Sequence, residues 1–133
     1  MLFTDLYELS MASVYDAEDM NREAVFELFF RQLPADLDYV LACVQTACAE
    51  ALNEFRFSPD ELEWLAGLGR FPEAFLKRLG ELRFSGDVSA VAEGSAVFPF
   101  EPVLQVRAPL IEAQLVETLL LNFVHSHSVL ASK

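Results

Sequence analysis

The segment that decides the fold is Leu110 to Leu130, LIEAQLVETLLLNFVHSHSVL, near the end of the chain. Its apolar residues recur at helical spacing and cover nearly the whole circumference, so the pattern predicts one long helix. Glu112, Glu117 and Asn122 interrupt it and leave no apolar run long enough to span a membrane. A helix this apolar has to be covered by protein on most of its sides. We therefore expect it to lie against protein beyond the sequence given.

The region before this helix has the pattern of a sheet. From Leu82 to Val106, short apolar or alternating runs predict three or four strands joined by tight turns. The breaks fall at Gly86, Gly94, Pro99 and Pro102, and Pro109 ends the region. A separate stretch, Ala24 to Arg31 (AVFELFFR), is rich in aromatic residues and too short for a typical helix, so it predicts a buried strand.

The first part of the chain predicts two helices. Thr4 to about Asp16 predicts a short helix that Thr4 or Asp5 caps, with Asp5 and Glu8 placing negative charge in its first turn. After a break at Pro34, apolar residues at helical spacing from Leu37 to Phe55 predict a second helix, which is amphipathic.

A capping box marks the next helix. Ser58-Pro59-Asp60-Glu61 places Pro at the first helical position and predicts a helix that ends near Gly67 or Gly69. A short helix from Pro72 to Leu79 should stop at Gly80. Because helices and strands do not alternate regularly, the pattern predicts an α+β fold. With no repeat and no linker, we expect residues 1–133 to form one domain.

Composition and charge narrow the class of protein. Of 133 residues, 53% are hydrophobic, more than a domain that buries roughly two-thirds of its unfolded surface can easily hide, which argues for a covering partner. The 9 basic residues do not cluster, and the net charge of −12 disfavours binding to nucleic acid or to anionic membranes. Met1 to Asp5 lacks the basic and apolar regions of a signal peptide. We therefore expect a soluble, cytoplasmic protein.

Cysteine and histidine offer little for metal binding. Cys43 and Cys48 are five residues apart in the predicted second helix, so their Cα atoms should lie roughly 8 Å apart, beyond disulfide reach, and packing is the favoured role. On a helix, His125 and His127 point about 200° apart and cannot share a metal, whereas on a strand they could. We expect no metal site in this chain.

Four other residues are candidates for a polar site. Arg31 is either a strand-end charge that reaches solvent or a planar donor at the rim of a site for an anionic ligand. Tyr7, near the first helix, can simply be a core residue of that amphipathic helix. Glu112 and Glu117 lie five residues apart and should face apart, so they do not form a general acid–base pair. The residues alone predict an acidic α+β domain with an incompletely covered surface.

Several ordered blocks resemble nicotinate phosphoribosyltransferases. The opening block, Thr4 to Ala12 (TDLYELSMA), is similar to the family's TDLYELTMA. The later blocks are Val25–Arg31, Leu33-Pro34, Phe84–Val88, Glu93-Gly94, Phe98-Pro99, Glu101-Pro102, Glu112–Thr118 and Leu120–Asn122. The resemblance covers essentially the whole chain and about the N-terminal third of that enzyme.

The resemblance implies a fold and a reaction. The fold is an N-terminal α/β sandwich-like domain whose last helix leads toward an irregular barrel that this chain does not include. Family members form nicotinate mononucleotide from nicotinate and phosphoribosyl pyrophosphate with Mg²⁺, and ATP hydrolysis through a phosphohistidine improves the yield. The family dimerises head to tail, with each site between one subunit's N-terminal domain and the other's barrel.

The resemblance also assigns substrate-binding residues. Tyr7 would stack on the pyridine ring of nicotinate in the neighbouring subunit's site, with Asp5 beside it. Arg31 matches a residue that approaches the phosphates in the related nicotinamide enzymes. The sequence departs from the family in the last helix, where His125, Ser128 and Ser132 replace an Asn and two Thr.

We therefore expect the N-terminal part of a nicotinate phosphoribosyltransferase, inactive alone, which pairs as a homodimer or with a complementing barrel chain. The catalytic residues, Mg²⁺ and ATP would belong to the complete enzyme. Two alternatives stay open: a stand-alone, non-catalytic interaction domain that docks or oligomerises through residues 110–130, and a quinolinate phosphoribosyltransferase. The TDLYEL opening favours the nicotinate enzyme over the quinolinate enzyme.

Overall fold

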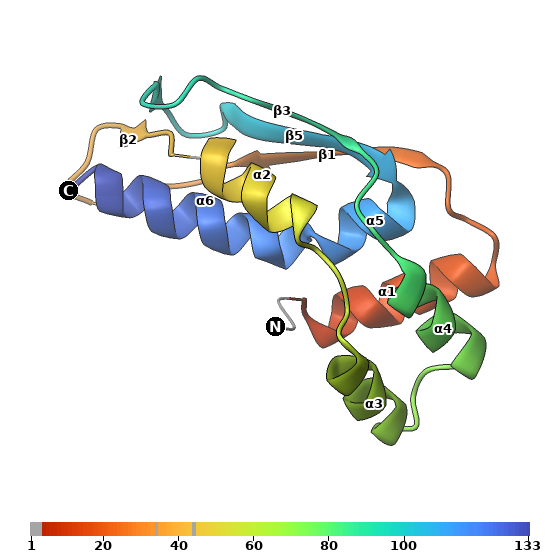
Figure 1. The fold of residues 1–133 in the computed structure, drawn as a ribbon. Helices are drawn as coiled ribbons and strands as arrows, with labels where there is room; N and C mark the ends of the chain where they lie inside the picture. Colours follow the sequence, from red (N-terminus) through yellow and green to blue (C-terminus); the bar gives the residue numbers. More distant parts are fainter. Residues whose placement is uncertain (1–3, 34, 44) are drawn as a thin grey trace.

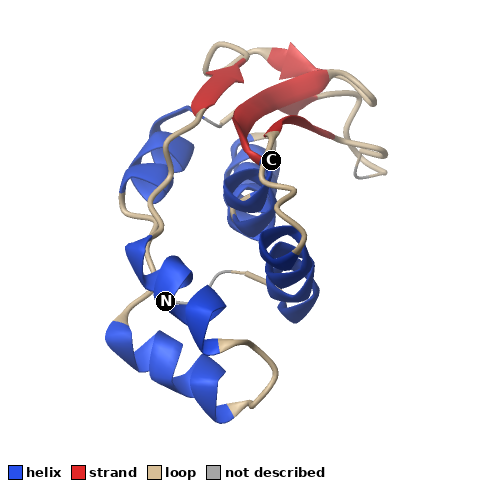
Figure 2. Cartoon of the chain, turned by 90° about the vertical axis from the view of Figure 1, so that its right-hand side faces the viewer, coloured by secondary structure: helices blue, strands red, loops and turns tan. Residues whose placement is uncertain are grey.

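A computed structural model describes residues 4–133 apart from residues 34 and 44, and shows mixed helices and strands (Figure 1). The elements in chain order are α1 (Leu6–Ala17), β1 (Glu23–Phe29), β2 (Val40–Leu41), α2 (Gln45–Asn53), α3 (Pro59–Gly67), α4 (Glu73–Glu81), β3 (Asp87–Ala90), β4 (Ala96–Val97), β5 (Pro102–Pro109), α5 (Leu110–Leu115) and α6 (Glu117–Ala131). The sheet lies along α6, while α1, α3 and α4 form a group of helices away from it (Figures 1 and 2). The α+β prediction is confirmed.

The main sheet has three antiparallel strands in the order β1-β5-β3. Strand β5 is central, and its Val106 pairs with Phe26 on one side and Val88 on the other. Leu104, Val106 and Ala108 alternate along β5 and are buried on the covered face of the sheet, and Val103 is buried as well.

Strand β1 lies at the edge of the sheet, so the prediction that it is a buried strand is wrong. Its residues alternate between exposed and partly buried, and Val25 and Phe29 on the outer side are 49% and 39% exposed. The run of apolar residues suggested burial on both faces. The central position is instead taken by β5, whose place in the sheet depends on pairing with residues about 80 positions earlier.

The predicted helix from Leu37 to Phe55 forms only in its second half, as α2. Val40 and Leu41 form β2, which pairs with Val97 and Ala96 of β4. Because Val40 is fully buried in that pairing, a long-range contact outweighs the helical spacing of the sequence.

The expected cysteine spacing changes with the shorter helix. Cys43 precedes α2, so the helical spacing expected between Cys43 and Cys48 does not apply; both cysteines are free. The predicted break at Pro34, and Val44 within the predicted helix from Leu37 to Phe55, lie outside the described residues.

The local capping signals are confirmed. The Ser58 hydroxyl accepts a hydrogen bond from the Glu61 N–H at 3.3 Å, and the Glu61 carboxylate accepts one from the Ser58 N–H at 2.8 Å. This reciprocal pair begins α3, as the capping box predicts. Helix α4 also forms where the sequence predicts a helix, but it continues through Gly80, the predicted stop, and ends at Glu81.

The C-terminal apolar segment forms two helices with a break at Val116, not one. Most of α5 is buried within the chain. Helix α6 buries one side, with Leu120 and Val124 inside, and exposes 45% of Leu121 and 76% of Leu130 on another. Coverage of that exposed side by further protein stays a prediction.

The buried apolar residues form two clusters. The sheet cluster joins the strands to α2 and α6, and includes Val40, Leu104 and Val124. The helical cluster joins α1, α3, α4 and α5; its members are Leu9, Ala12, Phe57, Leu65, Phe75, Leu79, Ile111 and Leu115. Helix α5 contributes Ala113 to the sheet cluster and Ile111 and Leu115 to the helical cluster, so it is common to both.

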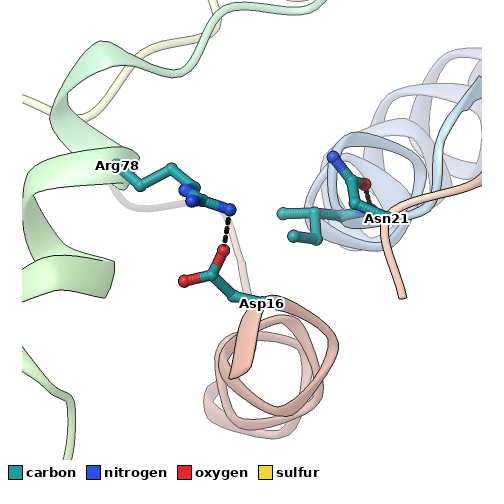
Figure 3. A network of polar contacts seen from close by, with 4 residues as sticks. Asp16, Asn21 and Arg78 are labelled. Carbon is teal, nitrogen blue, oxygen red and sulfur yellow. Dashed lines mark hydrogen bonds and ion pairs between the residues drawn. The ribbon is translucent and has the colours of Figure 1, made fainter. Parts of the chain in front are cut away.

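Polar contacts fix the C-terminal end of α1. Asp16 forms an ion pair with Arg78 of α4, and the Asn21 side-chain oxygen accepts a hydrogen bond from the Ile111 N–H at 3.0 Å (Figure 3). These contacts tie one end of α1 to α4 and the following turn to α5.

Candidate substrate-binding site at the junction of α1 and α6

The sequence places Asp5 and Tyr7 at the start of α1, and the structure brings both against the start of α6. Asp5 is the N-cap of α1, and Tyr7 lies in the first turn. Both side chains are exposed, which excludes the alternative that Tyr7 is a core residue. An exposed aromatic ring on an anchored helix is available to a ligand.

The Tyr7 hydroxyl donates a hydrogen bond to Glu117 Oε1 at 3.0 Å. Partial burial, this hydrogen bond and the nearby carboxylates raise the pKa of Tyr7 to about 12. The phenol therefore keeps its proton at neutral pH and remains a donor. Tyr7 as a whole is 50% exposed, so the residue remains open to solvent while Glu117 accepts a hydrogen bond from its hydroxyl.

Glu117 is held in turn by a buried amide. The Gln114 side-chain nitrogen donates a hydrogen bond to Glu117 Oε2 at 2.9 Å, and Gln114 is only 4% exposed. One carboxylate oxygen of Glu117 thus accepts a hydrogen bond from Tyr7, and the other accepts one from Gln114 of α5. Glu112, by contrast, accepts hydrogen bonds from Ser85, so the two glutamates have separate partners.

The Thr118 hydroxyl joins Asp5 to Glu8. Thr118 Oγ1 lies 3.1 Å from Asp5 Oδ2 and 2.7 Å from Glu8 Oε1. Glu8 Oε1 also accepts a hydrogen bond from the Thr118 N–H at 3.1 Å. These contacts, with the Tyr7–Glu117 hydrogen bond, form a polar seam between α1 and α6.

Arg31 lies at a cavity beside this seam. The cavity, of about 550 Å³, lies between β1 and α6. Its lining residues are Phe26, Glu27, Leu28, Phe29, Phe30, Arg31, Gln32, Leu104, Val106, Ala113, Glu117, Leu120, Leu121, Val124, His125 and Val129. Glu117 therefore belongs both to the cavity and to the seam, whereas Arg31 is an exposed residue at the cavity.

His125 and His127 lie on α6, where they do not share a ligand position. The His127 ring stacks on Phe123 with centroids 5.6 Å apart, and its Nδ1 lies 2.7 Å from the Phe123 carbonyl oxygen. The His125 ring lies 6.5 Å from that of Phe30. Both rings thus make packing contacts within the chain.

Among residues 4–133 without 34 and 44, no three His, Cys, Asp or Glu side chains come together as metal ligands. The carboxylates nearest the candidate site already accept hydrogen bonds from Tyr7, Gln114 and Thr118. The described residues of this site therefore offer no ready set of Mg²⁺ ligands.

Sequence reasoning missed the α6 half of this site. Glu8 was predicted only as a first-turn charge, yet it is fully buried. Glu8 is the third helical residue after the N-cap Asp5, which is the spacing of a capping box. That spacing indicates the hydrogen bond from the Asp5 N–H to Glu8, but not the contacts of Glu8 with α6. Thr118 and the partnership of Glu117 with Tyr7 join residues 110 positions apart, which no local pattern indicates.

The architecture matches the N-terminal region of a solved enzyme. The crystal structure of human nicotinic acid phosphoribosyltransferase aligns with a TM-score of 0.87 and 38% identity over 97% of this chain and 27% of that one. Nicotinate-nucleotide pyrophosphorylase from Pyrococcus furiosus shares the fold, with a TM-score of 0.65 and 18% identity over 91% of this chain and 24% of that one. The fold therefore defines an N-terminal domain of the phosphoribosyltransferase class.

The sequence specifies the family within that class. Residues 2–125 match the nicotinate phosphoribosyltransferase (NAPRTase) N-terminal domain, and the chain belongs to this family. A nicotinate phosphoribosyltransferase of Mycobacterium tuberculosis is 53% identical over 99% of this chain. That of Bacillus subtilis is 39% identical, also over 99%.

The chain spans 28% of the length of the mycobacterial relative and 27% of the Bacillus one. Its match is to the N-terminal portion of a nicotinate phosphoribosyltransferase. Across the part of the chain that the structure describes, no helix has the length and apolar character needed to cross a bilayer.

Proposed function

We propose that this chain is the N-terminal part of a nicotinate phosphoribosyltransferase that forms nicotinate mononucleotide from nicotinate and phosphoribosyl pyrophosphate in the cytoplasm. The observation that carries the proposal is the 53% identity over 99% of the chain to a relative named for that activity. The exposure of Tyr7 and Asp5 at one helix end supports it, because substrate-binding residues need an open face.

The chemistry gives these residues defined roles. In the reaction the pyridine nitrogen attacks the anomeric carbon of the ribose, pyrophosphate leaves, and the transition state carries oxocarbenium-like charge. The exposed ring of Tyr7 would fix the approach of the pyridine ring, which is a proximity effect. Asp5 would lie beside Tyr7 in the same site. In a head-to-tail homodimer this surface of one subunit would complete the site of its neighbour.

Arg31 is proposed to contact the phosphates of the second substrate. A guanidinium group offers paired N–H donors that match phosphate oxygens, and Arg31 is exposed at the cavity beside the seam. Because the chain has a net charge of −12, most of the positive lining for two anionic substrates would come from the rest of the enzyme. Mg²⁺ and ATP are likewise proposed for the complete enzyme and not for this chain's residues.

Kinetics of the complete enzyme test these roles. Tyr7→Ala should raise the nicotinate KM about ten-fold, since loss of one aromatic stacking partner costs about 1–3 kcal/mol. Arg31→Met should raise the KM for phosphoribosyl pyrophosphate and leave the nicotinate KM little changed. Unchanged kinetics for both variants would remove these residues from the site. Product formed by the purified 133-residue chain would refute the proposal that it is inactive alone.

The alternative of a stand-alone interaction domain rests on the exposed apolar side of α6, where Leu121 and Leu130 are 45% and 76% exposed. Mass spectrometry of the native protein distinguishes the two proposals. A mass that includes a barrel supports the enzyme. A native mass of the 133-residue chain alone, together with oligomers in size-exclusion chromatography, supports the interaction domain.

A further inference from the structure

Glu8 is a fully buried acidic side chain whose two oxygens both have partners. Oε2 accepts a hydrogen bond from the Asp5 N–H at 3.0 Å and another from the Thr4 hydroxyl. Oε1 accepts hydrogen bonds from the Thr118 N–H at 3.1 Å and from the Thr118 hydroxyl at 2.7 Å. A carboxylate supplies acceptors only, so this set of four donors suits Glu and no other side chain of the same length.

These contacts make one carboxylate the cap of two helices. The Asp5 N–H belongs to the N-terminus of α1, and the Thr118 N–H belongs to the first turn of α6. Helix α6 begins after Val116, whose side chain has no polar atom to cap it. Glu8 therefore satisfies a first-turn amide of α6 from a distance of 110 residues, and its charge suits both positive helix ends.

We propose that Glu8 is the positioning residue of this site: by capping α1 and α6 together, it holds Asp5 and Tyr7 in register with Thr118 and Glu117. The inference rests on the proposed function, in which Tyr7 and Asp5 face the substrate. Glu8 itself is fully buried, so its proposed role is to position its neighbours and not to contact the substrate.

The register follows from neighbouring pairs. Tyr7 and Glu8 are consecutive on α1, and their partners Glu117 and Thr118 are consecutive on α6. The Tyr7–Glu117 pair is exposed, and exposed contacts hold a geometry weakly. The Glu8 side chain is fully buried and its contacts are partly buried, so they are less exposed to water than the Tyr7–Glu117 pair and provide the stronger constraint.

Glu8→Gln is the sharpest variant because it keeps the size of the side chain. Its amide nitrogen must replace one of the two oxygens, so it faces either the Asp5 N–H or the Thr118 N–H with a donor. One of the two caps is then lost. The matched control is Asp16→Asn, which removes the ion pair with Arg78 at the opposite end of the same helix.

In the complete enzyme, Glu8→Gln should raise the nicotinate KM about ten-fold, because misplacement of a contact surface by about 1 Å is costly. The KM for phosphoribosyl pyrophosphate should change by less than about two-fold, since the substrates bind different residues. Asp16→Asn should lower the melting temperature and leave both KM values within the same limit. An equal rise in nicotinate KM for both variants would mean that Glu8 acts only through helix stability and would overturn the proposal.

Two further measurements separate this inference from the proposed function. If Tyr7→Ala raises the nicotinate KM and Glu8→Gln does not, Glu8 has no positioning role although the function stands. If Tyr7→Ala does not change the nicotinate KM, the proposed function of Tyr7 is wrong, and the positioning role of Glu8 is overturned with it. Should Glu8→Gln not fold, Thr118→Val removes the hydroxyl that contacts both Glu8 and Asp5, and Thr118→Ser keeps it. The Val variant should raise the nicotinate KM and the Ser variant should restore it; equal values would overturn the proposal.

Discussion

The two apolar clusters are held together in different ways. In the sheet cluster, β1 and β3 pair with β5 through backbone hydrogen bonds, and buried side chains of the strands pack with those of α2 and α6. The helical cluster has no such ladder, so α1, α3 and α4 keep their places through side-chain packing and a few polar ties. The proposed site lies where these two regions meet. Residues from both regions contribute to it, with Tyr7 from one and Glu117 from the other.

The difference suggests what each kind of contact does. Apolar burial stabilises each cluster but tolerates small shifts between them, because it is not directional. Hydrogen bonds are directional and fix one alignment. The polar seam between α1 and α6 therefore sets the geometry of the site. Helix α5 contributes residues to both clusters, so we expect the two clusters to unfold together.

The largest expected effect comes from the helical cluster. Phe75 is 1% exposed, so Phe75→Ala should lower the free energy of unfolding by about 3–5 kcal/mol. Trp64→Ala is the control, because Trp64 is 57% exposed and surface changes stay within about 0.5 kcal/mol. Urea denaturation followed by circular dichroism gives both values.

The same variant tests whether the clusters are coupled. If α5 joins them, Phe75→Ala should also speed hydrogen exchange at the buried amides of β5, for example Val106. Faster exchange confined to α1, α3 and α4 would show that the two clusters unfold separately.

The next effect concerns the sheet cluster. A Cβ at Gly86 would overlap the Cβ of Ala108 and approach the Arg107 carbonyl oxygen to 2.5 Å. Gly86→Ala should therefore cost about 1–3 kcal/mol of stability, the usual range for overpacking. Gly67→Ala is the matched control, since a Cβ there meets nothing within 4 Å, and it should be neutral or stabilise α3 by up to about 1 kcal/mol. Equal losses at the two positions would contradict the close approach of β3 to β5.

The smallest effect is at the seam and depends on pH. The pKa of Tyr7 is raised from 10.0 to about 12 in the folded chain. The folded state then holds the phenol proton more tightly, so this contribution to stability is fully present below about pH 10 and is lost as the pH rises to about 12. The difference in unfolding free energy between the wild type and Tyr7→Phe should therefore shrink over this range.

Glu117→Gln sharpens that test. It removes the charge next to the phenol, so the pKa of Tyr7 should fall toward its ordinary value of about 10. Ultraviolet titration with Tyr7→Phe as the subtraction control measures it among the 3 tyrosines of the chain. A Tyr7 titration that Glu117→Gln does not move would show that the hydrogen bond is not maintained.

The elements that local signals predict are those whose contacts are near in sequence. Ser58 and Glu61 make reciprocal hydrogen bonds three residues apart, and the sequence shows them directly. The α+β class and the helices α1, α3 and α4 were predictable for the same reason. The motif residues Asp5, Tyr7 and Arg31 were recognised through resemblance, because each is an ordinary residue in its local pattern.

Features that depend on distant pairing were not predictable. Val40 and Leu41 have helical spacing but pair with β4, and β1 is displaced to the edge because β5 takes the centre. Glu8 looks like a first-turn charge until α6 lies beside it. The burial of a residue depends on what packs against it, and a single sequence does not show that partner.

Calorimetric titration of nicotinate into the complete enzyme tests the central claim most directly, namely that the α1–α6 junction presents Tyr7 to the substrate. We expect Tyr7→Ala to weaken the nicotinate Kd about ten-fold, and Tyr7→Phe, which keeps the ring, to change it by less than about three-fold. A nicotinate Kd that is the same in the wild type and in Tyr7→Ala would contradict the account.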